Sequence, residues 1–261
     1  MKKINIFTLC CGRSDLYEKS LKSVIKNVVK ENKKYNFYFY VNDDSGNVSI
    51  NNEFTKLLKK YLPDGNFNFF ASKKNLGQSL SMINLVKKAN VDDNDIVFQI
   101  EEEFILDKPI NIEKNINLWK KIEKEFDTKI MQIIFRTDAH SNFEMSLEGL
   151  KKSKKNILKY LDDKFITCSN KYRNKIDHFG GSIINNDFCC HPHISKGYHY
   201  NKLKNKDLIV EKKSTAEDLI GYANLEYAKL WINDKIYSSH IGDYRYYSVF
   251  EGAKVRSQTS T

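Results

Sequence analysis

Three consecutive glutamates, Glu101, Glu102 and Glu103, are the residues of this chain whose type and spacing point most directly to chemistry. They follow a nearly continuous run of β-branched and aromatic residues, Ile96, Val97, Phe98 and Ile100, which predicts a buried strand. Like charges this close repel one another, and a divalent cation would relieve that repulsion, because carboxylate oxygens suit Mg²⁺ and Mn²⁺. The alternative is an acidic strand end left in water, since charge runs are usually solvated.

A second acidic pair and a glycine-containing loop follow two other predicted strands. The apolar run Phe37–Val41 ends in Asn42-Asp43-Asp44, which is again acid at a strand end; the alternative is a polar Asx turn. The basic segment Lys73–Ser79 opens a predicted helix. Such a loop could bind phosphate through its backbone N–H groups, but it lacks the glycine spacing of known phosphate-binding loops.

The last part of the chain adds two acids and a histidine. Glu217 and Asp218 lie in the first turn of a predicted final long helix, where acids are often only capping partners but could also provide a general base. A lone histidine is usually structural, but His240 lies among small residues in a turn-like segment, which favours access over burial. The helix is predicted from one apolar face, formed by Ile220, Ala223, Tyr227 and Leu230.

The elements that must position these residues alternate between strand and helix over the first hundred residues. This alternation predicts an α/β fold with a mostly parallel central sheet flanked by helices. The second half is less regular, with a charged helix at Ile112–Phe126, a strand at Ile130–Phe135 and a Lys-rich region at 137–175 that could form a flexible flap or face phosphate. No repeat or proline-rich linker divides the chain, so we predict one domain over residues 1–261.

Composition restricts the class of protein. The chain has 261 residues and 41% hydrophobic residues, enough for a core, and its net charge of +10 suits an anionic partner such as nucleotide phosphates, nucleic acid or an acidic membrane face. An AT-biased genome would also produce this lysine content. No apolar run approaches the ~20 residues of a membrane span. The five cysteines match neither a metal spacing nor a disulfide framework, so we expect reduced thiols and a cytoplasmic location.

The order of these features resembles the GT-A glycosyltransferases of the family 2 type, which use nucleotide-diphosphate sugars. The similarity lies in Asn75-Leu76-Gly77-Gln78-Ser79 followed by Asn84, in Ile100-Glu101-Glu102-Glu103 at the place of the E-D-D or D-x-D signature, and in Glu217-Asp218. It implies a Rossmann-like GT-A domain with a donor half at 1–106 and an acceptor half at 107–261. The chain departs from the family pattern because its signature acids are all glutamate, which leaves metal dependence open.

The resemblance also implies a role for each candidate residue. Glu103 and His240 would hold a divalent cation, Mn²⁺ or Mg²⁺, at the donor's diphosphate. Asp218, or Glu217 in its place, would take the proton of the acceptor hydroxyl, which predicts inversion by single displacement. The donor-binding residues would be Thr8, Arg13, Asp43, Asp44, Asn75, Gly77, Gln78, Glu101, Glu102 and Arg245.

The predicted function is therefore transfer of a hexose or pentose from a nucleotide-diphosphate sugar, expected to be a UDP-sugar, to an acceptor hydroxyl. The acceptor would be a glycan or, given the basic charge, a hydroxylated base in DNA. Two alternatives remain at the level of sequence. One is a non-catalytic nucleic-acid-binding protein with a degenerate nucleotide site, and the other is a metal-dependent nucleotidyltransferase.

Overall fold

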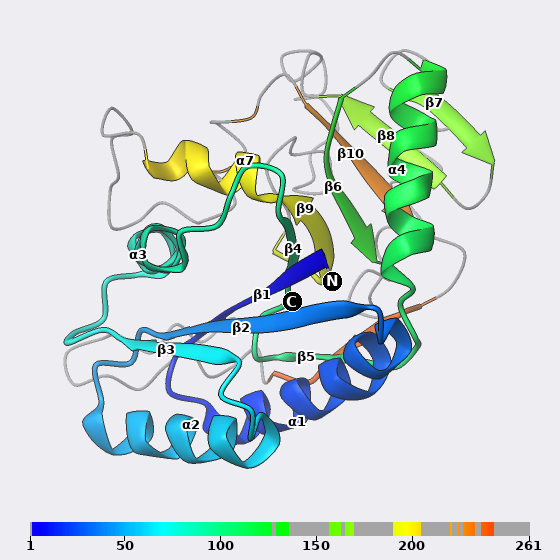
Figure 1. The fold of residues 1–261 in the computed structure, drawn as a ribbon. Coiled ribbons are helices and arrows are strands. Elements are labelled where there is room, and N and C mark those ends of the chain that lie inside the picture. Colours follow the sequence, from blue (N-terminus) through cyan, green and yellow to red (C-terminus); the bar gives the residue numbers. More distant parts are fainter. Residues whose placement is uncertain are drawn as a thin grey trace, which may run out of the picture.

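The computed structural model describes residues 2–126, 129–135, 157–162, 165–169, 190–204, 220, 224, 227–232 and 236–242. These residues form an α/β fold around one nine-stranded sheet (Figure 1). Its strands are β1 (Lys2–Cys10), β2 (Tyr35–Asp43), β3 (Phe67–Ala71), β4 (Ile96–Gln99), β6 (Ile130–Phe135), β7 (Ile157–Asp162), β8 (Phe165–Ser169), β9 (His193–Lys196) and β10 (Ala228–Ile232).

The strand order is β3-β2-β1-β4-β9-β6-β10-β8-β7. The four strands β3, β2, β1 and β4 are mutually parallel, as are β6 and β10, whereas β9 and β8 run against their neighbours. The predicted α/β class with a mostly parallel sheet is thus confirmed. A second sheet has only two antiparallel strands, β5 (Phe104–Leu106) and β11 (Ser238–His240).

Helices cover both faces of the parallel strands. In Figure 1, α1 and α2 lie on one side of β1, β2 and β3, and α3 and α7 lie on the other. A π-helical turn at Ile25–Val29 continues α1. The helices are α1 (Ser14–Val24), α2 (Val48–Tyr61), α3 (Gln78–Ala89), α4 (Ile112–Phe126) and α7 (Gly197–Asn201).

Strand β1 is buried on both of its faces. Ile4 and Ile6 belong to the apolar core that includes residues of α1 and α2, and Phe7 and Leu9 belong to the core that includes residues of α3 and α7. Successive side chains of a strand point to opposite faces, so a strand covered on both sides needs an almost continuous apolar run. This packing fixes the carboxyl end of β1, from which the next turn emerges.

Two predicted elements of the second half are confirmed, and a third is wrong in its C-terminal part. Helix α4 and strand β6 have the predicted bounds, Ile112–Phe126 and Ile130–Phe135. The predicted final helix included Ile220, Tyr227 and Leu230. Ile220 is helical, but the chain at Ala228–Ile232 is strand β10. This strand pairs with β6 on one side and β8 on the other, so both rows of its backbone N–H and C=O groups are used in the sheet. Tertiary pairing therefore outweighs the helical periodicity.

The nine-stranded sheet takes strands from both predicted halves of the chain, and the division into a donor and an acceptor half stays a prediction. Within the Lys-rich region 137–175, the segments that the structure describes form strands β7 and β8, and the remainder lies outside the described residues. Among the helices that the structure describes, none has the length and apolar character needed to cross a membrane.

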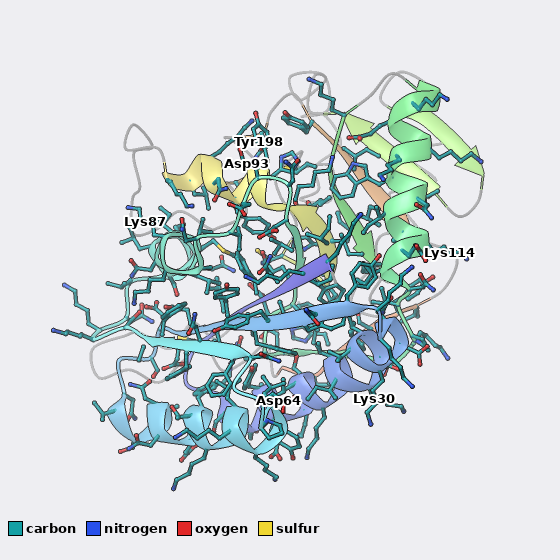
Figure 2. The ribbon with its side chains drawn as sticks, in the orientation of Figure 1. Lys30, Asp64, Lys87, Asp93, Lys114 and Tyr198 are labelled. Carbon is teal, nitrogen blue, oxygen red and sulfur yellow. The ribbon has the colours of Figure 1, made fainter. Side chains whose placement is uncertain are left out.

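Exposed charged side chains lie at the periphery of this fold. Figure 2 shows Lys30, Asp64, Lys87 and Lys114 on the outer side of the helices and loops that carry them, and all of them are exposed. None of these residues is among the predicted site residues, so they offer sites for control substitutions.

Candidate active site

The carboxyl ends of β1, β2 and β4 bring the predicted donor residues to one edge of the sheet. Cys10 pairs with Asp43 at the end of β2, and Phe7 pairs with Gln99 at the end of β4. Two backbone hydrogen bonds extend this alignment beyond the strands, from the N–H of Asp44 to the carbonyl of Cys10 and from the N–H of Ile100 to the carbonyl of Phe7. Ligands bind at this edge in parallel α/β sheets.

Asp43 fixes the turn that follows β1. Its Oδ1 accepts a hydrogen bond of 2.7 Å from the backbone N–H of Gly12, and its Oδ2 accepts from the backbone N–H and the hydroxyl of Ser45. Burial raises the pKa of the Asp43 carboxyl, and these hydrogen bonds oppose the rise. Gly12 has a φ of 77°, a conformation that favours glycine, so the turn depends on this residue type.

Asp44 holds the loop before α3. Its carboxylate accepts hydrogen bonds from the backbone N–H groups of Leu76, at 3.0 Å, and Gly77, at 2.8 Å. Asn75 reinforces the loop, because its Oδ1 accepts from Gly77 N–H and its Nδ2 donates to the sulfur of Cys11. The loop is thereby tied both to the end of β2 and to the turn after β1.

The three glutamates differ sharply in their surroundings. Glu101 is partly exposed, and its Oε1 accepts a 2.9 Å hydrogen bond from Nε2 of Gln78, the first residue of α3. Glu102 is only 3% exposed, and its Oε1 accepts from Nε of Arg13 at 2.9 Å, from Nη2 of Arg13 at 2.6 Å and from the N–H of Cys11 at 3.1 Å. Burial raises the pKa of Glu102, and the charge of Arg13 opposes that rise.

Glu103 lies between two nitrogen donors. Its Oε2 accepts a 2.8 Å hydrogen bond from Nη1 of Arg13, and its Oε1 lies 3.3 Å from Nε2 of His240. Burial acts to raise the pKa of Glu103, but the hydrogen bond to His240 and the charge of Arg13 outweigh it and lower the pKa. Burial acts to lower the pKa of Arg13, but the adjacent glutamates raise it further above its ordinary value, so the guanidinium stays charged.

The small β5–β11 sheet brings His240 to Glu103 across a long sequence separation. His240 pairs with Phe104, and the backbone N–H of Ile241 donates a 2.7 Å hydrogen bond to the carbonyl of Glu103. Gly242 then passes against the pair: a Cβ placed there would lie 2.8 Å from Oε2 of Glu103 and 3.0 Å from Cε1 of His240. The absent side chain leaves the space that the carboxylate and the imidazole occupy.

The pair formed by Glu103 and His240 fits a divalent cation in the chemistry of its donor atoms. A carboxylate oxygen and an imidazole nitrogen are both ligands of Mn²⁺, and they approach each other in space that Gly242 leaves clear. Within the described residues no group of three or more His, Cys, Asp or Glu could hold a metal. A cation here would therefore need ligands in addition to Glu103 and His240.

The structure joins most of the predicted site residues by direct contacts. Thr8, which is 2% exposed, lies in β1 two residues before its end. Glu217, Asp218 and Arg245 lie outside the described residues. The contacts join Arg13, Asp43, Asp44, Asn75, Gly77, Gln78, Glu101, Glu102, Glu103 and His240, directly or through the turn at residues 10–13.

Sequence reasoning missed four residues that build this site: Cys11, Gly12, Ser45 and Gly242. Gly12 and Ser45 carry a usable signal, because a glycine after a buried strand and a serine after two aspartates are both typical of turns. Cys11 acts through its backbone N–H and its sulfur, and Gly242 acts through the absence of a side chain. Neither role can be read from residue type.

No protein-family model matches the sequence, and a comparison with curated proteins finds no match either. The fold, in contrast, is similar to that of solved glycosyltransferases. The mannosyltransferase PcManGT from Pyrobaculum calidifontis, solved with GDP-Man and Mn²⁺, gives a TM-score of 0.58 at 10% sequence identity over 93% of this chain. TarS from S. aureus gives 0.54 at 14% identity over 94% of this chain. GalNAc-T7, solved with UDP, GalNAc and Mn²⁺, gives 0.51 at 11% identity over 93%.

These likenesses confirm the resemblance to GT-A glycosyltransferases at the level of the fold. The chain spans 57% of the length of the PcManGT chain, 44% of GalNAc-T7 and 37% of TarS. At such low sequence identities, a shared fold does not show that two proteins share an activity or a substrate. These must be argued from the residues of the site.

Proposed function

We propose that the protein is a glycosyltransferase that uses a nucleotide-diphosphate sugar as donor. The observation that supports this most strongly is the set of contacts that links the acidic segment Glu101–Glu103, the pair Asp43–Asp44 and the loop before α3 at one sheet edge. This set lies in a fold similar to that of PcManGT and GalNAc-T7, which were solved with GDP-Man and with UDP. A UDP-sugar is the expected donor.

The described residues would divide the work of donor binding. The carboxylates of Asp43 and Asp44 accept hydrogen bonds from backbone N–H groups, so these residues would hold the turn after β1 and the loop before α3 in place beside the donor. Glu101 is partly exposed and is oriented by Gln78, which suits it to accept a hydrogen bond from a ribose hydroxyl. Arg13 contacts Glu103 and would therefore lie close to the expected diphosphate.

Glu103 and His240 are the residues that would hold a divalent cation, as their donor atoms and the space beside Gly242 permit. Such a cation would supply neutralisation of the negative charge that develops on the departing diphosphate. The protein's own part is to keep the Glu103 carboxylate ionised and aimed at this point. Arg13 and His240 favour that ionised form by lowering the pKa of Glu103.

Proton removal from the acceptor is proposed for Asp218, with Glu217 as its alternative. The acceptor oxygen would then attack the anomeric carbon as the bond to the diphosphate breaks, in one step with inversion, and the nucleoside diphosphate would leave. Removing a general base typically slows a reaction about 10²–10⁴-fold, so Asp218→Asn should lose turnover by that factor and keep donor affinity. Glu217→Gln is the matched variant, and wild-type turnover in Asp218→Asn would move the role to Glu217.

The deciding experiment is calorimetric titration with UDP, GDP, CMP and dTDP, each with Mn²⁺ and with EDTA. We expect one nucleoside diphosphate to bind, and to bind more weakly with EDTA. Glu103→Gln should weaken Mn²⁺-dependent binding, whereas Lys87→Gln on the periphery should not. Binding of none of the four nucleotides contradicts the proposal.

The reaction products test the chemistry that follows binding. When sugar acceptors are screened with the matching nucleotide sugar, the protein should release a nucleoside diphosphate. A nucleotidyltransferase would instead release pyrophosphate from a nucleoside triphosphate. We assign the acceptor only as a hydroxyl group, and the described residues give no specific support to a modified base in DNA.

A further inference from the structure

The guanidinium of Arg13 lies where positive charge is needed between two adjacent glutamates. Nε and Nη2 both bond to Oε1 of Glu102, and Nη1 bonds to Oε2 of Glu103. The two acids differ in burial, since the Glu102 side chain is 4% exposed and the Glu103 side chain 21%. One cationic side chain therefore neutralises a deeply buried acid with two bonds and a more accessible acid with one.

Both oxygens of Glu103 are engaged in this arrangement. Arg13 bonds to Oε2, and His240 lies 3.3 Å from Oε1. A divalent cation that binds the Glu103 carboxylate must therefore displace at least one of these partners or share an oxygen with it. Arg13 is the partner that a cation would displace more readily, because like charges repel and the Arg13 side chain is 25% exposed, against 6% for His240.

We propose that Arg13 is an exchangeable counter-ion of Glu103, which competes with the divalent cation and yields one of its N–H donors when the cation binds. The purpose of the cation, which is to bind the donor's diphosphate, rests on the proposed function. The competition between Arg13 and the cation for Glu103 does not. It makes Arg13 a positioning residue for Glu103 before the donor arrives.

Exchange at Glu103 would not detach Arg13 from the site. The two bonds to Glu102 lie in the buried part of the cluster, and Glu102 Oε1 is also fixed by the N–H of Cys11. The guanidinium would thus stay anchored while Nη1 is released at the edge where the diphosphate is proposed to lie. Arg13 and the divalent cation would then present three positive charges to the same anionic group, in place of the single charge of Arg13 alone.

The test is the affinity for Mn²⁺ alone, measured by calorimetry on the full chain without nucleotide. Arg13→Met by itself would leave the buried Glu102 carboxylate without its partner and could prevent folding. The informative comparison is therefore Glu102→Gln, which keeps Arg13 on Glu103, against the double variant Arg13→Met/Glu102→Gln, which removes the competitor. Removing both members of a buried pair is far less costly than removing one.

We expect the double variant to bind Mn²⁺ about tenfold more tightly than Glu102→Gln, the factor that corresponds to one charge-assisted hydrogen bond that the cation no longer has to replace. Adding Glu103→Gln to both backgrounds should remove the difference, which places the competition at Glu103. Lys22→Met, which removes an exposed ion pair with Glu18, should leave Mn²⁺ affinity unchanged. Equal or weaker binding by the folded double variant, or no binding by either variant, overturns the inference.

A nucleotide titration separates this inference from the proposed function. If Arg13 competes with Mn²⁺ but no nucleoside diphosphate binds, the exchange stands and the glycosyltransferase assignment fails. If a nucleoside diphosphate binds in a Mn²⁺-dependent way while removal of Arg13 leaves Mn²⁺ affinity unchanged, the assignment stands and the exchange fails. In the first case the site would bind a cation for another purpose.

Discussion

A single absent side chain sets the geometry beside Glu103. The Gly242 backbone passes so close that a Cβ would lie 2.9 Å from Cβ of Glu103 and 2.8 Å from its Oε2. A contact under 3 Å requires one partner to move, and Glu103 is held by Arg13 and His240. The position therefore couples the path of the chain after β11 to the direction of the carboxylate.

Gly242→Ala should displace the Glu103 carboxylate and weaken nucleotide binding in the presence of Mn²⁺ by roughly tenfold, with a loss of about 1–3 kcal/mol in unfolding free energy from overpacking. Calorimetry and urea denaturation measure the two effects. Gly65→Ala is the control for nucleotide binding, because a Cβ there meets nothing within 4 Å; its φ of 70° predicts some loss of stability but no loss of binding. If Gly242→Ala binds nucleotide as the wild type does, the close approach has no bearing on the site.

At the residue scale, the sequence reveals which side chains are candidates but not how they divide their roles. Glu101, Glu102 and Glu103 are identical as residue types, and their spacing predicts only a shared acidic edge. The structure separates them because Arg13, Gln78 and His240 approach from three different elements. That division depends on tertiary contacts, which no local pattern contains.

At the scale of elements, the loop before α3 depends on one carboxylate. Asp44 is 4% exposed and accepts hydrogen bonds from the N–H groups of Leu76 and Gly77, at the start of the helix that carries Gln78. Hydrogen bonds to a charged group each contribute about 1.5–3 kcal/mol, and they fix the loop against β2. Loss of these hydrogen bonds would release the whole loop. Gly77 has a φ of 83°, a backbone conformation that is kept only while contacts such as these hold it.

Asp44→Ala should lower the free energy of unfolding by about 2–4 kcal/mol and speed hydrogen exchange at the amides of Leu76 and Gly77 more than elsewhere. Hydrogen exchange read by NMR gives the local effect directly. Asp64→Ala serves as the control, since Asp64 is exposed at the periphery (Figure 2). Unchanged hydrogen exchange at both amides in Asp44→Ala would show that the loop keeps its conformation without the Asp44 carboxylate.

Elements with strong local patterns were predictable, and those defined by distant partners were not. Strands β1 to β4 and helix α4 follow apolar runs or helical spacing that the sequence displays. Helix α2 has a weaker local signal, because its Ser- and Asn-rich start is typical of a loop, although Asn47 caps it and Phe54 and Leu58 form a buried face. The β5–β11 pair joins three-residue strands far apart in sequence, so periodicity does not reveal it.

At the scale of the whole molecule, two buried histidines link stability to pH. His193 in β9 and His199 in α7 are 0% and 2% exposed, and burial lowers the pKa of His193 to about 3 and that of His199 to about 4. An unfolded chain titrates its histidines near pH 6.5. Between pH 6.5 and pH 4 the unfolded state therefore binds more protons than the folded state, so stability is complete above this window and falls as pH is lowered through it.

Each histidine should cost roughly 1.5 kcal/mol of unfolding free energy between pH 6.5 and pH 5, so the wild type should lose about 3 kcal/mol over this interval. Urea denaturation at both pH values measures the difference. His193→Asn should lose only about half as much over the same interval, because one titrating group is gone.

Tyr200→Phe is the matched control. The Tyr200 hydroxyl lies 2.9 Å from Nε2 of His193, so the variant removes this contact but leaves both buried histidines to titrate. It should be less stable than the wild type at both pH values and retain the full pH dependence. An equally steep loss in His193→Asn would show that His193 does not carry the acid sensitivity of the fold.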